Sequence, residues 1–426
     1  MSFLAPLLFS AAGALAAPEN AAPSGCNATH LDPHGFSKVE LAVVEEVLPR
    51  ALPACIEVDE LAEFERRLWT LGLFDDVKIE CKDDALAVTV REKWTLIPGI
   101  DFGTAKTLRD SYFFASLIES NMFGRAMECG FYGAYYERAF SGETWCGEHS
   151  FAARRPSFEI NASYVGSGFV FDDEPANYNW ERRRAGGRLG MRFPFPYGSR
   201  FRFAVLPLGY HEKSTGETSP TLSREGWFAG VGLRVVRDAF EWHDLVPRGV
   251  RMGLEITPGF FFTDGETRGR HSVTAQIVGA ARFSPRTGLL ANLVGEAVNA
   301  GDPNHSFLLG SISAWRGSFG TVGGVRGLPD NRNRNASHVF SNVELRHSID
   351  ITSRLFLQPA LFVDGGVYQR MNSAGQLQAA EPALSGGGGL RLLPTFLAWA
   401  ILRVDGGHIF LPHQGWFVQL AFSQYL

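Results

Sequence analysis

The sequence Gly323-Gly324-Val325-Arg326-Gly327-Leu328-Pro329-Asp330 lies within residues 317–337, a segment without strand or helix periodicity. Glycines on both sides of Arg326 allow backbone conformations with positive φ, and Pro329 restricts the chain as it leaves the segment. The segment is therefore expected to be a loop. Loops ordinarily lie on the surface, where a single arginine is solvated. The sequence that follows favours a different interpretation.

Two strand-like segments downstream each carry one carboxylate among apolar or aromatic residues. Residues 339–346 (Val-Phe-Ser-Asn-Val-Glu-Leu-Arg) contain Glu344, and residues 361–368 (Leu-Phe-Val-Asp-Gly-Gly-Val-Tyr) contain Asp364. A glycine-rich loop that carries an arginine between glycines, followed by two strands that each carry a carboxylate, is an order of motifs known from one family of membrane proteins.

This order resembles the last third of the bacterial outer-membrane assembly and translocation barrels. That superfamily joins periplasmic POTRA domains to a surface-antigen-type β-barrel, and it includes the barrel assembly machinery and the two-partner secretion transporters. In the family, a loop with a Val-Arg-Gly-Tyr or Val-Arg-Gly-Phe core folds back into the barrel lumen, where its arginine meets acidic residues of the wall. The resemblance implies that Arg326, Glu344 and Asp364 form a lumen lock.

The loop and strand motifs of the family map onto further positions of this sequence. The resemblance matches Val325 and Gly327 to the loop core, and Phe362 and Gly366 to a Phe-x-Asp-x-Gly strand signature. Leu328 departs from the pattern, because the family has an aromatic residue there.

The start of the chain has the composition of an export signal. Residues 1–17 are apolar and end in small residues, with an Ala-x-Ala pattern at 14–16, and they are too few to span a membrane as a helix. They are expected to be a signal peptide. Residues 18–35 are rich in Ala, Pro, Asn and Gly and are expected to be a linker.

Residues 36–93 have the pattern of a small α+β domain. Apolar residues at helical spacing predict an amphipathic helix that Gly72 ends: Leu61, Phe64, Leu68 and Leu71. An earlier helix is expected at residues 39–48. Alternating apolar residues at 77–81 and 86–90, separated by Asp83-Asp84, predict a hairpin.

Residues 73–77 (Leu-Phe-Asp-Asp-Val) are similar to the helix-to-strand junction of a POTRA domain, Gly-x-Phe-x-x-Val. The resemblance implies a single POTRA domain, short at its N-terminal edge, with a client-binding region at Phe74, Val77 and Ile79. An unrelated α+β cap is the alternative.

From residue 94 to residue 426 the chain has strand periodicity. Residues 131–136, 158–165, 201–206, 253–261 and 275–281 alternate, and Gly, Pro, Asn and Asp clusters separate them. At roughly 20 residues for each strand and connection, this length gives about sixteen strands, an even number as a closed bacterial barrel requires. The predicted fold is mainly β: a transmembrane antiparallel barrel after a small α+β domain. Residues 119–125 resemble a second family motif near the barrel start, with Asn121, Phe123 and Gly124 in order.

Composition agrees with such a barrel and excludes some functions. The chain has 426 residues, a net charge of -5, 34 Phe and 47 Gly. It has no basic excess for nucleic acid. The mean hydropathy of -0.05 is typical of a soluble protein, but alternating lipid-facing and lumen-facing residues give barrels the same average.

Five cysteines in an exported chain could form disulfides. Proximity of the predicted elements suggests Cys55 with Cys81 and Cys129 with Cys146, leaving Cys26. Metal-ligand spacings such as Cys-x-x-Cys are absent.

The sequence also lacks the catalytic motifs Gly-x-Ser-x-Gly, Gly-x-x-x-x-Gly-Lys and His-Glu-x-x-His. We therefore expect no catalytic residues, no metal and no cofactor, although a barrel protease or lipase with dispersed residues is an open alternative.

The resemblance implies an outer-membrane protein that assembles, inserts or translocates other polypeptides, with its POTRA domain in the periplasm. Expected partners are unfolded outer-membrane or secreted polypeptides, outer-membrane lipids, and periplasmic or lipoprotein accessory subunits. A dedicated transporter of a single partner and a passive porin-like barrel are the alternatives.

Overall fold

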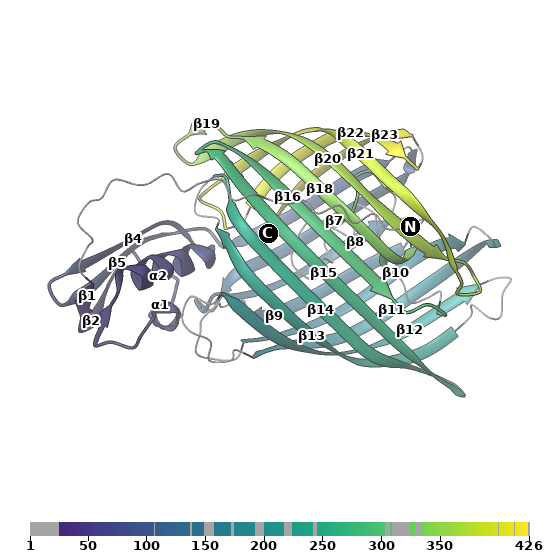
Figure 1. Ribbon diagram of the computed structural model, residues 1–426, viewed down its shortest axis with the longest axis horizontal. Helices are drawn as coiled ribbons and strands as arrows, with labels where there is room; N and C mark the ends of the chain where they lie inside the picture. Colours follow the sequence, from purple (N-terminus) through teal and green to yellow (C-terminus); the bar gives the residue numbers. More distant parts are fainter. Residues whose placement is uncertain are drawn as a thin grey trace, which may run out of the picture.

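Two units follow one another along the chain: an N-terminal module, residues 25–93, and a barrel, residues 94–424 (Figure 1). The computed structural model describes residues 25–105, 107–136, 139–148, 157–171, 174–191, 200–216, 224–241, 245–302, 307–308, 324–328, 334–398, 400–412 and 414–424. The predicted signal peptide lies outside these residues. In the part of the chain described, no helix is both long enough and apolar enough to cross a membrane.

The N-terminal module is a small α+β unit. Its elements are β1 (Cys26–Ala28), β2 (His30–His34), α1 (Leu41–Val47), β3 (Ala54–Ile56), α2 (Val58–Thr70), β4 (Phe74–Lys82) and β5 (Ala85–Glu92). Strand β5 lies in the centre of a three-stranded sheet, antiparallel to β4 and parallel to β2, while β1 pairs with β3. The order of the two helices and the hairpin agrees with the sequence prediction.

Helix α2 forms because its apolar residues share one face and its ends are capped. Phe64 and Leu68 are fully buried in the core of the module. At the N-terminus, Glu57 and Glu60 form a reciprocal capping box. At the C-terminus, Gly72 takes a φ of 70°, which a glycine adopts at little cost.

The predicted linker at residues 18–35 is wrong for residues 26–34, which form β1 and β2. Strand β2 contains Pro33 and two histidines and lacks apolar alternation, so the sequence pattern does not reveal it. Its backbone nevertheless pairs with β5 along five residues. The sheet edge that was expected to be missing is therefore present.

One predicted disulfide is wrong and the other is present. Cys26, not Cys55, is bonded to Cys81, with their Cα atoms 5.7 Å apart. Because β1 pairs with β3, Cys26 lies opposite Ile56 in the core, whereas Cys55 is exposed and has a free thiol. Cys129 is bonded to Cys146, which lies directly opposite it in the neighbouring strand.

Sixteen long strands form a closed antiparallel barrel in the described part of the chain. They are β6 (Leu96–Ala105), β7 (Thr107–Met122), β8 (Met127–Tyr136), β9 (Ala139–Glu148), β10 (Ser157–Phe171), β11 (Glu174–Met191), β12 (Phe201–Gly216), β13 (Arg224–Glu241), β14 (Arg248–Thr263), β15 (Glu266–Ser284), β16 (Thr287–Val298), β18 (Arg334–His347), β20 (Leu355–Met371), β21 (Leu377–Pro394), β22 (Ala400–Leu411) and β23 (Gly415–Gln424). The short strands β17 (Phe307–Leu308) and β19 (Ile349–Thr352) pair with β18 and β20. Pairing of β23 with β6 closes the barrel.

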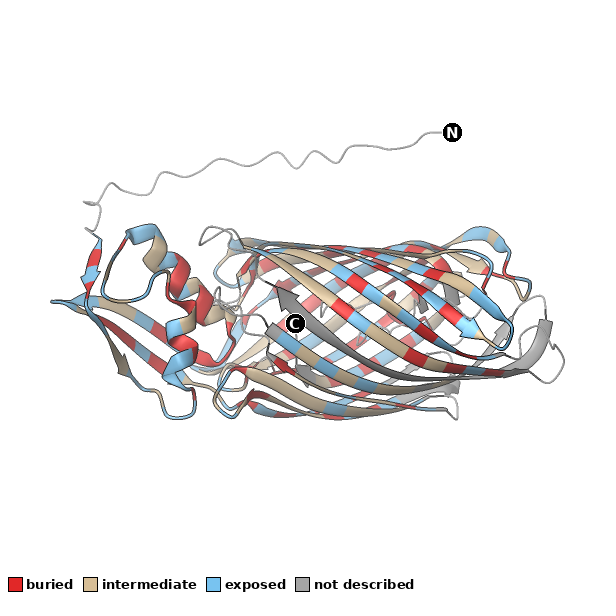
Figure 2. Ribbon diagram, turned by 90° about the horizontal axis from the view of Figure 1, so that it is seen from below, coloured by how far each residue is buried: buried red, intermediate tan, exposed pale blue. Residues whose placement is uncertain are grey.

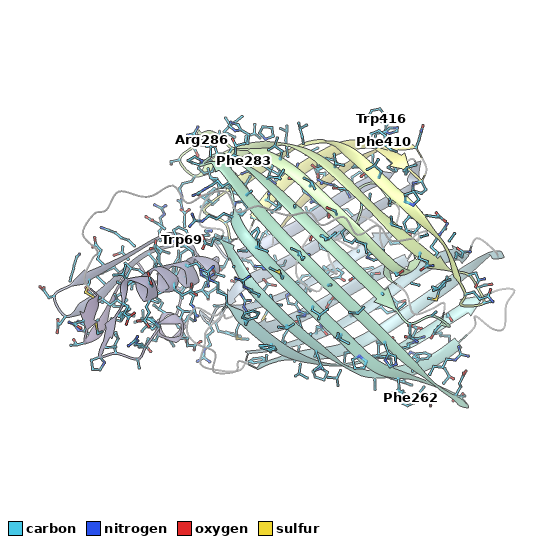
Figure 3. All side chains as sticks on the ribbon, viewed as in Figure 1. Trp69, Phe262, Phe283, Arg286, Phe410 and Trp416 are labelled. Atoms are coloured by element: carbon cyan, nitrogen blue, oxygen red, sulfur yellow. A yellow bond between two sulfur atoms is a disulfide. The ribbon has the colours of Figure 1, made fainter. Side chains whose placement is uncertain are left out.

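Side chains alternate between the two faces of the barrel wall, which gives the banded pattern of Figure 2. In β18, Val343 and Leu345 are exposed on the outer face, while Asn342 and Glu344 are buried on the inner face. An apolar outer face and a polar interior are what a barrel in lipid requires. Large aromatic residues are also exposed toward the strand ends, as at Phe262, Phe283, Phe410 and Trp416 (Figure 3).

The module docks against one end of the barrel through its backbone and through ion pairs. Backbone hydrogen bonds join Glu40 of the module to Gly124 of the barrel, and they join Trp94, the residue directly after the module, to Phe396 and Ala398. Asp75 of the module forms an ion pair with Arg354 of the barrel, at 2.8 Å. The second predicted motif lies at this junction, because Asn121 also donates to the Lys38 carbonyl.

Peptide mapping under non-reducing conditions is expected to recover linked Cys26–Cys81 and Cys129–Cys146 peptides, with Cys55 alkylated. Replacing Cys26 and Cys81 by serine is expected to destabilise the module by about 2–4 kcal/mol, because the bridge closes a long loop. Cys55→Ser is the matched control and is expected to have no effect. A linked Cys55–Cys81 peptide would contradict this pairing.

Candidate functional site

Residues 324–328 of the loop between β16 and β18 are buried against the inner face of the barrel wall. Arg326 is only 3% exposed. The carboxylates that surround it belong to residues whose strand neighbours face outward, such as Val343, Val363 and Val404. The arginine therefore points into the interior of the barrel.

Asp364 on β20 makes the closest contacts with Arg326. Its carboxylate accepts hydrogen bonds from Nε and Nη2 of Arg326, at 2.6 and 2.8 Å. It also accepts the backbone N–H of Arg326, at 3.1 Å. Asp364 is fully buried. This two-pronged pairing fixes the orientation of the guanidinium as well as its position.

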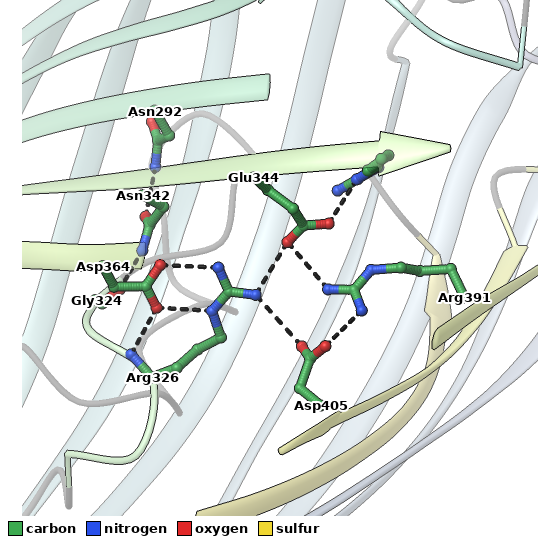
Figure 4. Close-up of polar contacts among 9 residues, drawn as sticks. Asn292, Gly324, Arg326, Asn342, Glu344, Asp364, Arg391 and Asp405 are labelled. Atoms are coloured by element: carbon green, nitrogen blue, oxygen red, sulfur yellow. Dashed lines mark hydrogen bonds and ion pairs between the residues drawn. The ribbon is translucent and has the colours of Figure 1, made fainter. Parts of the chain in front are cut away.

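The network extends from Arg326 to three further strands (Figure 4). Nη1 of Arg326 donates to Glu344 on β18 at 2.9 Å and to Asp405 on β22 at 3.4 Å. Arg391 on β21 bridges the same two carboxylates, and Arg346 pairs with Glu344. Each buried carboxylate thus faces at least one guanidinium.

Apolar contacts hold the loop tip beneath these ion pairs. The guanidinium of Arg326 lies 3.5 Å from the centre of the Phe362 ring, a cation–π contact. Val325 and Leu328 are buried in one cluster with Phe362 and Phe417. Leu328 therefore occupies apolar packing space although it is not aromatic.

A row of amide side chains fixes the loop from the other side. Asn342 donates to the Gly324 carbonyl at 2.9 Å, and Asn292 donates to Asn342 at 3.3 Å. Gln276 donates in turn to Asn292. The row crosses β15, β16 and β18, so the backbone of the loop is also tied to β15 and β16, which carry none of the ion pairs of Arg326.

The structure brings together the residues expected to form the lumen lock: Arg326, Glu344 and Asp364. The motif glycines have steric roles. A Cβ on Gly366 would lie 2.5 Å from the Val339 carbonyl oxygen, and one on Gly327 would lie 2.5 Å from Phe417. Gly327 also has a φ of 86°.

The structure corrects the predicted position of the client-binding residues. Phe74 and Val77 are buried in the core of the module, and Ile79 packs against that core. Their side chains pack inside the module, because the alternation that predicted the hairpin places them on its inner face. The side chains of Phe74 and Val77 are therefore not exposed to a partner, while that of Ile79 is partly buried.

Sequence reasoning missed Asp405 and Arg391. A signal for Asp405 is present, because Val-Asp-Gly-Gly at residues 363–366 recurs at residues 404–407. The two aspartates lie on β20 and β22 and both contact Arg326. Arg391 has no comparable motif, and only the folded barrel places it beside them.

In the described residues, no cluster of three or more His, Cys, Asp or Glu side chains is arranged to hold a metal ion. The carboxylates of the site instead bind arginines. The arrangement holds a loop in place, and each of its three carboxylates is paired with a guanidinium.

No protein-family model and no curated protein matches the sequence. Among solved structures, CdiB from Escherichia coli is similar over 93% of this chain and 76% of its own, with a TM-score of 0.58 and 14% identity. CdiB from Acinetobacter baumannii is similar over 93% of this chain and 74% of its own, with a TM-score of 0.57 and 12% identity. BamA from Haemophilus ducreyi lacking POTRA domains 1–3 is similar over 93% of this chain and 85% of its own, with a TM-score of 0.52 and 13% identity. The fold is that of the BamA and CdiB barrels. These similarities confirm the predicted resemblance at the level of the fold. Sequence identities this low support no conclusion beyond the fold.

Arg326→Ala is expected to lower the free energy of unfolding by about 3–5 kcal/mol, because it leaves the buried carboxylate of Asp364 without its guanidinium partner. Denaturant unfolding of the protein in detergent micelles, followed by tryptophan fluorescence, measures the change. Arg286→Ala is the control. Arg286 forms an exposed ion pair with Asp350, and its loss is expected to cost about 0–1 kcal/mol. Equal effects of the two substitutions would contradict a locking role for Arg326.

Proposed function

We propose that the protein is an outer-membrane factor that assembles or translocates other polypeptides, with its module as a POTRA domain in the periplasm. The observation that carries the proposal is a loop arginine held by ion pairs inside a barrel of the BamA and CdiB fold, with an α+β module docked at one end. The work would be done by binding energy, without catalysis or a cofactor.

The weakest strand pairing in this scheme is the seam between the first and last barrel strands. Strands β23 and β6 share six residue pairs. On their other sides, β23 shares ten pairs with β22 and β6 shares nine with β7. A short seam can open more easily and offer its edge to an incoming strand by β-augmentation.

The module could bind an extended polypeptide in the same way. Strands β2 and β4 are the outer strands of its three-stranded sheet, and unpaired backbone groups at such edges accept a further strand. Recognition by backbone pairing would not require the side chains of Phe74 or Val77, which lie in the core.

A transporter dedicated to a single secreted protein is the second candidate, because two of the similar structures are CdiB proteins. A passive pore is less well supported, because the loop tip is fixed in the barrel interior by several ion pairs.

Depletion of the protein, followed by quantitative proteomics of the outer membrane and the medium, tests the proposal. Loss of many unrelated barrels would support an assembly factor, and loss of one secreted or surface protein would support a dedicated transporter. An unchanged proteome would overturn both.

Locking the seam tests the role of its opening. Leu420 on β23 lies opposite Phe102 on β6 and opposite Val404 on β22, and all three side chains are exposed. In a Cys55→Ser background, a disulfide between Leu420→Cys and Phe102→Cys is expected to reduce client assembly at least tenfold, and reductant should restore it.

The matched control pairs Leu420→Cys with Val404→Cys. It shares one cysteine with the seam variant but links strands that need not separate, so assembly should stay near the wild-type level. An equal loss of client assembly in both variants would show that the disulfide does not act by keeping the seam closed.

A further inference from the structure

A second arginine, Arg270 on β15, is fully buried in the barrel and belongs to none of the motifs already described. Its Nη2 lies 2.9 Å from the Glu212 carboxylate on β12. Its Nη1 donates to the hydroxyl of Tyr210 at 3.1 Å. Its guanidinium lies 3.6 Å from the centre of the Phe261 ring on β14. These contacts tie Arg270 to β14, the adjacent strand, and to β12, which lies three strands away in the wall.

A further partner of Arg270 comes from outside the wall strands. Asp302 accepts a hydrogen bond from Nε of Arg270 at 2.8 Å and lies 2.6 Å from Nη2. Asp302 is 3% exposed and follows the end of β16, at the start of the loop that carries Arg326. A buried carboxylate–arginine pair, in which Nε and Nη2 of Arg270 both contact Oδ2 of Asp302, therefore joins the foot of this loop to the wall.

Backbone contacts at the same point hold residues 299–302 from both sides. The backbone N–H of Asn299 donates to the His271 carbonyl on β15, and its side-chain oxygen accepts from the His271 N–H. The side-chain amide of Asn299 donates to the Gly269 carbonyl. Gly301 donates its backbone N–H to the Gly375 carbonyl in the turn between β20 and β21, at 3.1 Å. Residues 299–302, the foot of the loop, thus lie between β15 and the turn that joins β20 to β21, at the end of the barrel far from the module.

We propose that Arg270 is a positioning residue that fixes the foot of the loop through Asp302, separately from the tip held by Arg326. The inference rests on the proposed function, because it concerns the same loop. In the described residues the loop is held at its foot to β12, β14 and β15, at residues 307–308 to β18, and at residues 324–328 to β18, β20 and β22. Releasing one anchor leaves the other set of ion pairs intact.

Hydrogen exchange of the full-length protein in detergent micelles tests the proposal without a client. Asp302→Asn preserves shape but removes the charge that Arg270 holds. It is expected to accelerate exchange of the amides of residues 299–302 at least fivefold, because the backbone bonds there lose their support. Asp302→Glu, which keeps the charge, is expected to restore most of the protection.

Two controls separate positioning of the loop from general stability. Glu212→Gln removes the wall partner of Arg270 and is expected to accelerate exchange mainly in β12 and β15. Asp350→Asn removes an exposed ion pair with Arg286 and is expected to change nothing at residues 299–302.

Unchanged exchange at residues 299–302 in Asp302→Asn would overturn the proposal, and so would an equal acceleration there by Glu212→Gln. Since the assay measures only the loop, its failure would leave the assembly proposal standing. A negative depletion experiment would conversely leave the double anchor standing.

Discussion

Burial of the positive charge of Arg326 is the constraint around which this end of the chain is built. Removing an ion from water costs several kcal/mol, and attraction to a partner offsets that cost only when the geometry is good and the remaining hydrogen bonds are satisfied. Asp364 supplies the good geometry, and Glu344 and Asp405 take the remaining donors. Because these acids come from three different strands, satisfying one guanidinium also fixes how those strands lie relative to one another.

Two buried arginine charges of the barrel are satisfied by the same kinds of contact. Arg326 lies over Phe362 and Arg270 lies over Phe261, and each also meets two or more carboxylates. An aromatic face satisfies the broad side of a guanidinium, which has no N–H group to donate, while carboxylates take its edge. Such sites can exist only on the inner face of the barrel wall, because the alternate side chains, which face lipid, are apolar.

Much of the architecture could be predicted from the sequence, because it depends on local patterns. Alternation predicts the barrel strands and helical spacing predicts α2, whereas the Arg326 contacts are implied by the family resemblance of the Val-Arg-Gly core. Strand β2 escaped prediction because its pairing depends on backbone groups and its side chains have no periodicity. Cys26 was consequently assigned no partner. Arg391 and Arg270 could not be predicted, since nothing near them in the sequence distinguishes an arginine inside a barrel from an arginine on its rim.

Gly327 shows how the loop tip and the closing strand depend on each other. Its missing Cβ leaves room for Phe417, which packs with the loop residues Val325 and Leu328. Phe417 also pairs with Ala105 across the junction of β23 and β6. The side chain of Phe417 therefore packs on the loop, while its backbone belongs to the strand pairing that closes the barrel. A displacement of β23 from β6 would also disturb the packing of Val325 and Leu328, so closure of the barrel and the position of the loop are coupled.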